Sequence, residues 1–157
     1  MPKKLSKKDI NKIYYGMILR IIVTLILLNI LSLYFRNDNN KYLILPIVIC
    51  VLDNIDNLCC NRIYYLLDKF MDILTYFYVY YLFNLNNIFL YIILYRLVGT
   101  FLYFLTLNGI WLIIFVDLSK EYLLYKYIFN DNYIYTPLVI IVKVYFEYYL
   151  YIKNYIK

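Results

Sequence analysis

Four aspartates lie close together in a stretch of the chain that is otherwise mostly apolar. The stretch reads VLDNIDNLCCNRIYYLLDKFMD and contains Asp53, Asp56, Asp68 and Asp72. Asp53 and Asp56 are three residues apart, and Asp68 and Asp72 are four apart, so each pair would share one face of a helix. Carboxylate oxygens are the ligands that hard divalent cations such as Mg²⁺ bind. Two such pairs on neighbouring helices therefore predict a site for a metal ion and a diphosphate.

The composition of the chain indicates that these aspartates belong to a membrane protein. Of the 157 residues, 65% are apolar, whereas soluble domains contain about 45 to 50%. The net charge of +6 does not predict nucleic-acid binding, because the basic residues are not interleaved on a polar face. Several of them instead precede the first apolar run: Lys3, Lys4, Lys7, Lys8 and Lys12. A basic end of this kind is typical of the cytoplasmic side of a membrane protein and attracts anionic membrane lipids.

The apolar runs predict an all-α, polytopic integral membrane protein with about six transmembrane helices, since a bilayer core takes roughly 20 apolar residues per helix. The predicted spans are residues 14–35, 42–60, 63–83, 88–107, 109–116 with an amphipathic continuation toward 129, and 133–152. Residues 1–13 are predicted to form a basic cytoplasmic N-terminus, and residues 14–157 one transmembrane helical domain. An even number of spans places both termini on the cytoplasmic side.

This topology places the four aspartates near the cytosolic end of the hairpin formed by the second and third spans. Each carboxylate within the membrane costs about 2.5 to 3.5 kcal/mol. The group therefore requires a water-filled cavity, a bound metal ion, or neighbouring cations such as Arg62 and Lys69. A single aspartate at a helix end can simply be solvated, but paired helical spacing on both spans favours a metal site.

The stretch resembles the signature of the CDP-alcohol phosphatidyltransferase family. That family carries, across its second and third membrane helices, the pattern DxxDGxxAR, eight residues, and then GxxxDxxxD. DNID matches the first two aspartates as Asp53 and Asp56, and DKFMD matches the last two as Asp68 and Asp72. The segment between Asp56 and Asp68 is shorter than in the family, and Arg62 lies one position after the arginine of the pattern. We interpret the chain as a divergent relative with a shortened motif loop.

The resemblance implies that the chain is an enzyme of phospholipid synthesis. Family members transfer a phospho-alcohol (phosphatidyl) group from a CDP-linked lipid or alcohol donor to an alcohol acceptor and release CMP. The resemblance also implies Mg²⁺ or Mn²⁺ held by Asp53, Asp56, Asp68 and Asp72, with Asp72 as the base that removes the proton of the acceptor hydroxyl. Membrane lipids are expected partners, nucleic acid is not, and the hypothesis admits a homodimer.

Charged residues outside the motif add further candidates. Arg96, in the fourth predicted span, resembles an arginine that family members often carry there. Arg62 and Arg96 are therefore candidate substrate-binding residues, although Arg96 is equally well explained as the partner of one of the aspartates, since an arginine within a membrane needs a partner. Arg20 in the first span poses the same question. Lys143 and Glu147, four residues apart in the last span, are expected to form a structural salt bridge.

Two other classes of function stay open at the level of sequence. The first is a non-catalytic multi-pass membrane protein, either an inactive relative of the transferases or a membrane organiser, and the shortened loop favours it. The second is an ion-conducting or proton-relay protein, but such proteins spread acids along the depth of the bilayer, whereas these aspartates gather at one end. The chain contains no histidine, which excludes histidine-dependent nucleophilic catalysis, and no glycine-rich phosphate loop.

Overall fold

The computed structural model describes residues 7–55, 62–130 and 133–155, and every regular element in these ranges is a helix. In chain order the elements are α1 (Lys7–Phe35), α2 (Lys41–Ile55), α3 (Arg62–Phe83), α4 (Asn87–Thr106), α5 (Ile110–Ile114), α6 (Ser119–Phe129), the 3-10 helix η1 (Tyr133–Tyr135) and α7 (Thr136–Tyr155). The predicted all-α fold is confirmed. The first helix begins inside the basic segment that was predicted to precede the first span.

Polar turns separate the helices where the sequence predicts. The run RNDNNK lies between α1 and α2, and NLNN lies between α3 and α4. Within NLNN, Asn84 adopts a left-handed conformation with φ of 47°, which asparagine tolerates better than most residues. The side chain of Asn86 accepts a hydrogen bond from the backbone N–H of Phe89 and so caps the first turn of α4.

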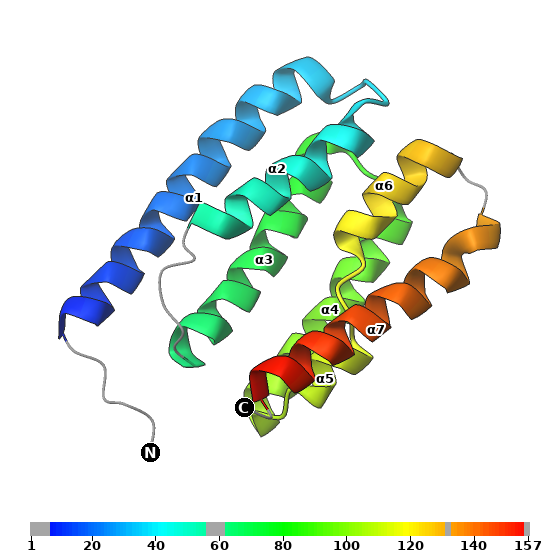
Figure 1. Cartoon of the computed structure of the whole chain (residues 1–157). Helices are drawn as coiled ribbons and strands as arrows, with labels where there is room; N and C mark the ends of the chain where they lie inside the picture. The colour runs from blue at the N-terminus through cyan, green and yellow to red at the C-terminus, as the bar shows by residue number, and fades with distance from the viewer. Residues whose placement is uncertain (1–6, 56–61, 131–132, 156–157) are drawn as a thin grey trace.

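Figure 1 shows the long helices side by side, with the first turn of α1 and the last turn of α7 at the same end of the bundle. α1 packs against α2 and α3, α3 packs against α4, and α6 packs against α2. The apolar core is therefore shared by five helices, and its buried members are Leu28, Leu45, Ile49, Leu52, Ile73, Tyr76, Val79, Phe83, Leu85, Phe89, Ile93, Tyr122 and Leu123.

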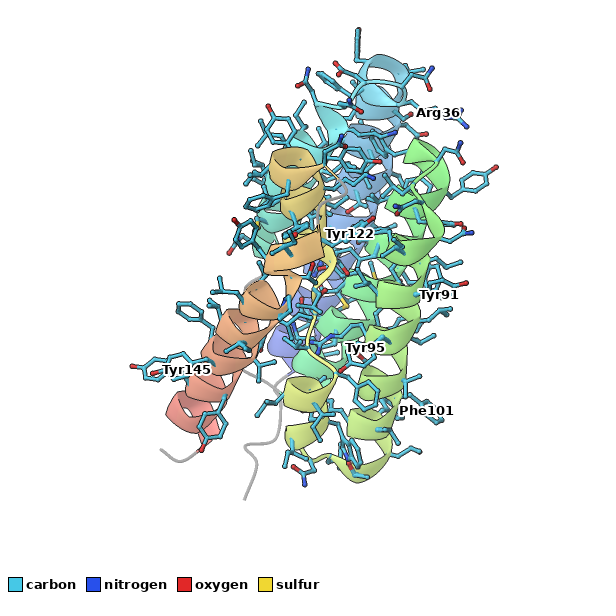
Figure 2. The ribbon with its side chains drawn as sticks, turned by 90° about the vertical axis from the view of Figure 1, so that its right-hand side faces the viewer. Arg36, Tyr91, Tyr95, Phe101, Tyr122 and Tyr145 are labelled. Atoms are coloured by element: carbon cyan, nitrogen blue, oxygen red, sulfur yellow. The ribbon has the colours of Figure 1, made fainter. Side chains whose placement is uncertain are left out.

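Large apolar side chains also cover the outside of the bundle. Figure 2 shows Tyr91, Phe101 and Tyr145 pointing away from the helices, with Tyr91 66% exposed, whereas Tyr122 lies in the interior. Extensive exposed apolar surface is typical of proteins that contact lipid or another protein. By length and composition, two helices are suited to crossing a membrane, namely Ile13–Phe35 within α1 and Asn87–Thr106, which is α4.

The other predicted spans do not meet the same criterion within the described residues. α2 has 15 residues there, fewer than the roughly 20 that a bilayer core requires. α3 is long enough, but it contains Asp68, Lys69 and Asp72. The fifth predicted span is divided into α5 and α6. Six spans therefore stay a prediction.

The division of the fifth predicted span is a non-helical segment at residues 115–118. Arg96 of α4 is 6% exposed, and its Nη1 atom donates to the carbonyl oxygens of Leu112, at 3.0 Å, and Phe115, at 2.7 Å. These charge-assisted hydrogen bonds satisfy carbonyl groups at the end of α5 that have lost their helical partners. Hydropathy could not reveal the break, because it is stabilised by a side chain from another helix.

Gly99 allows α4 to approach this non-helical segment closely. A Cβ atom at position 99 would lie 2.1 Å from the Cβ atom of Phe115, so the backbone of one segment would have to move. We expect Gly99→Ala to lower the free energy of unfolding by about 1 to 3 kcal/mol, the usual range for overpacking. Chemical unfolding of the purified protein in detergent measures this change.

The matched control for Gly99→Ala is Val98→Ile, because it adds one methyl group at a neighbouring side chain that is 48% exposed. This control should change the free energy of unfolding by less than about 0.5 kcal/mol. Equal effects of the two substitutions would contradict the importance of the close contact between Gly99 and Phe115.

Candidate functional site

Three of the predicted site aspartates converge on one buried arginine. The side chain of Arg20, from α1, is 0% exposed. Its Nη1 atom lies 2.8 Å from Asp68 Oδ1, and its Nη2 atom lies 3.0 Å from Asp53 Oδ1 and 2.6 Å from Asp72 Oδ1. A planar guanidinium group presents several donors in fixed directions. Arg20 therefore joins α1, α2 and α3 at a single point.

Two lysines hold the second oxygen of each of these carboxylates. Lys69 Nζ lies 3.0 Å from Asp68 Oδ2 and 3.2 Å from Asp72 Oδ2, and Lys120 of α6 pairs with Asp53 Oδ2. Among the residues that the structure describes, three negative charges thus face three positive charges. We call these residues the Arg20 cluster: Arg20, Asp53, Asp68, Lys69, Asp72 and Lys120.

The charges of the Arg20 cluster lie largely away from solvent. The side chains of Asp53, Asp68 and Asp72 are 22%, 16% and 12% exposed. Removing each charge from water costs several kcal/mol, and only close pairing with good hydrogen-bond geometry offsets that cost. The sequence allowed three ways to offset this cost, namely a water-filled cavity, a bound metal ion and neighbouring cations. The described residues supply the third, the neighbouring cations.

The start of α6 determines where Lys120 can reach. Asp117 precedes α6, and its Oδ1 atom accepts a hydrogen bond at 3.0 Å from the backbone N–H of Ser119, the first residue of the helix. Its Oδ2 atom accepts a hydrogen bond at 2.6 Å from the hydroxyl group of Tyr76, which is buried in α3. α6 is therefore tied to α3 at its first turn, which is the turn that brings Lys120 to Asp53.

The pairing within the Arg20 cluster bears on a metal site. Carboxylates from two helices are the donors that Mg²⁺ and Mn²⁺ prefer. Within the described ranges, however, no three or more acidic or cysteine side chains are arranged as a metal-binding group, and each cluster carboxylate oxygen faces a cation. Arg20 is fully buried, whereas Lys69 and Lys120 are 21% and 24% exposed. The carboxylate oxygens of the cluster suit a divalent cation if these two lysines turn away from the Oδ2 atoms.

Of the three remaining predicted site residues, the structure describes the side chain of one, Arg96. Asp56 lies outside the described residues. Arg62 is the first residue of α3, and its side chain also lies outside the described part. Arg96 donates to backbone carbonyl oxygens beside α5, so its interactions there are with the main chain and not with an aspartate. Its role in substrate binding stays a prediction.

The salt bridge expected in the last helix is present with an additional partner. Lys143 Nζ lies 3.8 Å from Glu147 Oε1, four residues further along α7. It lies closer, at 2.7 Å, to Glu121 Oε1 of α6. This ion pair therefore connects α6 with α7, as well as two turns of the same helix.

Sequence reasoning named Lys69 as a cation beside the aspartates, which the structure shows, and raised an acidic partner for Arg20, but it missed Lys120. Arg20 interrupts an apolar run in the first predicted span, and an arginine in that setting requires an acidic partner. The sequence therefore shows that Arg20 needs such a partner, but not which residue it is. Lys120 follows the polar residues Asp117 and Ser119 in an otherwise apolar region, which marks the end of an apolar run but not a break in the helix. Neither signal reveals which acidic residue is the partner, because that depends on the packing of α1 and α6.

The described residues define an all-helical structure that has two helices suited to crossing a membrane and a group of paired acidic and basic side chains contributed by four helices. No protein-family model matches the chain, and no curated protein or solved structure is significantly similar to it. The resemblance to the CDP-alcohol phosphatidyltransferases therefore rests on the motif residues themselves.

Proposed function

We propose that the chain is a membrane-embedded, metal-dependent phosphotransferase and a divergent relative of the CDP-alcohol phosphatidyltransferases. It moves a phospho-alcohol group from a CDP-linked donor to an alcohol acceptor in phospholipid synthesis. The observation that supports this most directly is the convergence of Asp53, Asp68 and Asp72 from two helices. Acids that were merely solvated at a helix end would have no reason to meet at one point.

The carboxylates are the proposed metal ligands. Asp53, Asp56, Asp68 and Asp72 would hold Mg²⁺ or Mn²⁺. Three of these aspartates, Asp53, Asp68 and Asp72, belong to the Arg20 cluster. Held by these carboxylates, such an ion would supply positive charge that stabilises the negative charge developing on the departing phosphate oxygen. The groups that bind the donor and remove the proton of the acceptor are side chains of the protein itself.

The cations of the Arg20 cluster have two distinct proposed roles. Arg20 is buried and bonded to three carboxylates, so it keeps their Oδ1 atoms aligned. Lys69 and Lys120 are partly exposed, and their ammonium groups would turn from the Oδ2 atoms to bind phosphate oxygens of the donor. Arg62, at the start of α3, is a further candidate contact for the donor.

The transfer also requires the acceptor hydroxyl to lose its proton. The acceptor oxygen forms a bond to phosphorus, the bond between phosphorus and the CMP oxygen breaks, and the proton passes to Asp72. A carboxylate within hydrogen-bonding reach of the acceptor can serve as this general base. Asp72 is the least exposed of the three described carboxylates, which suits a proton transfer that must be shielded from water.

The proposed topology has six spans, with α5 and α6 together forming the fifth. Both termini and the Arg20 cluster lie on the cytoplasmic side. The basic residues at the beginning of α1 support this orientation. The position of the last turn of α7 at the same end of the bundle supports an even number of crossings (Figure 1).

The proposal is tested by assaying membranes from cells that produce the full chain with radiolabelled CDP-alcohols and a set of acceptor alcohols. We expect label in the lipid extract together with an equal amount of CMP. Chelation of divalent cations should abolish the transfer, and Mg²⁺ or Mn²⁺ should restore it, because the carboxylates alone cannot neutralise a diphosphate. Membranes that lack the chain are the control, and absence of transfer with every donor and either metal would contradict the proposal.

A non-catalytic membrane protein is the second candidate, and the pairing of every described cluster carboxylate with a cation favours it. The charges of the cluster residues that the structure describes balance without an ion. The two candidates differ in the effect of metal on stability, because a ligand that binds only the native state adds about 2.7 kcal/mol at a concentration of 100 times its dissociation constant. The transferase predicts saturable stabilisation of the purified protein by Mg²⁺ or Mn²⁺, whereas the non-catalytic protein predicts none.

A further inference from the structure

The polar side chain of Asn29 lies on the outer face of α1. It is exposed there, within Ile13–Phe35, the part of α1 that is suited to crossing a membrane. Figure 1 shows α1 at one edge of the bundle, with α7 at the opposite edge. An exposed amide in such a helix is costly unless its hydrogen bonds are made. The exposed side chains that share its face along α1 include the apolar residues Ile22, Leu25, Ile26 and Leu33.

Tyr78 of α3 lies beside Asn29 and uses half of its amide group. The Nδ2 atom of Asn29 donates to the carbonyl oxygen of Leu25, at 2.7 Å, and to the hydroxyl oxygen of Tyr78, at 2.6 Å. Both hydrogens of Nδ2 are therefore in use. Among the described residues, however, Oδ1 of Asn29 accepts no hydrogen bond and the hydroxyl group of Tyr78 donates none. An unused acceptor and an unused donor thus lie side by side on this face.

This pair of groups is complementary to itself. In a dimer with two-fold symmetry, the same patch of each copy faces its counterpart, so a donor on the patch must find its acceptor on the same patch of the other copy. The hydroxyl group of Tyr78 can donate to Oδ1 of Asn29 in a second copy, and the second copy returns the same bond. With the bond from Asn29 to Tyr78 within each copy, these bonds close a ring of four, in which each strengthens the others.

We propose that this face of α1 and α3 binds a second copy of the chain, with Asn29 and Tyr78 at the centre of the contact. Asparagine side chains join helices within membranes by hydrogen bonds of this kind. The exposed apolar side chains on either side of the pair, among them Leu33 of α1 and Leu74 and Tyr81 of α3, pack against their counterparts. More than two turns of α1 separate Asn29 from the Arg20 cluster, so the contact does not depend on the transferase activity.

The test measures energy transfer between copies of the full chain in vesicles of phosphatidylcholine and phosphatidylglycerol. Each copy carries a donor or an acceptor fluorophore on a C-terminal tag, and the ratio of protein to lipid is varied. We expect transfer above the level of random proximity, falling as added lipid dissociates the dimer. Absence of such transfer at every ratio would mean that lipid covers this face, and would overturn the proposal.

Two substitutions make the test specific to the proposed face. Asn29→Leu and Tyr78→Phe should each raise the dissociation constant of the dimer about tenfold, because each removes two symmetry-related hydrogen bonds of the strength usual in membranes. A purely apolar interface would instead be unchanged or strengthened by Asn29→Leu. Tyr78→Phe keeps the ring and tests the proposal even if Asn29→Leu does not fold. If neither substitution raised the dissociation constant, the copies would meet through another face and the proposal would be wrong.

The matched control is Asn54→Leu in α2. Asn54 is also exposed, and its Nδ2 atom donates to the carbonyl oxygen of Cys50, four residues earlier, as that of Asn29 does to Leu25. Asn54→Leu should leave the dissociation constant unchanged, and an increase equal to that of Asn29→Leu would contradict the assigned interface. Combining Asn29→Leu with Tyr78→Phe should raise the constant no further than either alone, because the two residues act in one ring. Fully additive effects would contradict the ring.

Discussion

Replacing Arg20 with methionine is expected to lower the free energy of unfolding by about 3 to 5 kcal/mol, the range measured when one partner of a buried ionic group is removed. The substitution keeps much of the side-chain volume and removes the donors to Asp53, Asp68 and Asp72. Three carboxylates would then lie close together with only two lysines beside them. Denaturant titration in detergent, followed by circular dichroism, measures the change.

Two further variants separate the charge of Arg20 from its geometry. Arg20→Lys keeps one positive charge but offers a single ammonium group, which cannot reproduce the fixed fork of a guanidinium, so its stability should be intermediate. Combining Arg20→Met with Asp68→Asn and Asp72→Asn removes most of the repulsion and should recover part of the loss, because interacting sites are not additive.

The matched control is Arg36→Met, at an exposed arginine in the turn after α1 (Figure 2). It should change the free energy of unfolding by less than about 0.5 kcal/mol. If Arg20→Met and Arg36→Met had the same free energy of unfolding, the Arg20 cluster would not hold α1, α2 and α3 together.

Replacing Asp72 with asparagine is expected to reduce the rate of phosphotransfer by about 10² to 10⁴-fold, which is the usual contribution of a positioned general base. Asparagine retains an oxygen that can accept the hydrogen bond from Arg20, which is 2.6 Å long in the native protein. It cannot take the proton of the acceptor. Radiolabel incorporation in membranes, with saturating donor and metal, measures the rate.

Asp38→Asn is the control for Asp72→Asn, because Asp38 lies in the exposed turn between α1 and α2 and its side chain accepts hydrogen bonds from Asn40 alone among the described residues. Its rate should equal that of the native protein. Denaturant titration of Asp72→Asn must accompany the assay, since the substitution also removes a charge from the cluster. Full activity in a folded Asp72→Asn protein would rule out the role as base, whereas loss of activity together with loss of Mn²⁺ binding would assign the residue to the metal.

The ends of most helices could be predicted from the sequence because they depend on local chemistry. Polar runs such as NLNN interrupt apolar runs, and asparagine both caps a helix and tolerates a left-handed turn. The break between α5 and α6 could not be predicted in the same way. It depends on Arg96 and Gly99, two residues of α4 that act on the chain at Phe115.

The convergence of the aspartates was also predictable, in part. Helical spacing places Asp68 and Asp72 on one face, and the hairpin of the second and third spans brings Asp53 to them. Lys69 was predicted as a neighbouring cation, but the contacts of Arg20 and Lys120 with particular aspartates were not predictable. Arg20 is 33 residues from Asp53 and 52 from Asp72 along the chain, so its contacts depend on how α1 packs and not on any local pattern.

In the proposed six-span topology, the division of the fifth span would also have a consequence for biosynthesis. α5 has 5 residues and α6 has 11, so neither could enter a bilayer alone, where helices of about 17 to 25 residues are stable. Unsatisfied carbonyl groups are costly in hydrocarbon, and those of Leu112 and Phe115 find their donor on α4. Because ribosomes make α4 first, Arg96 is already available when these carbonyls emerge, and a rearranged gene that encoded α5 before α4 would deliver them to the lipid without a donor.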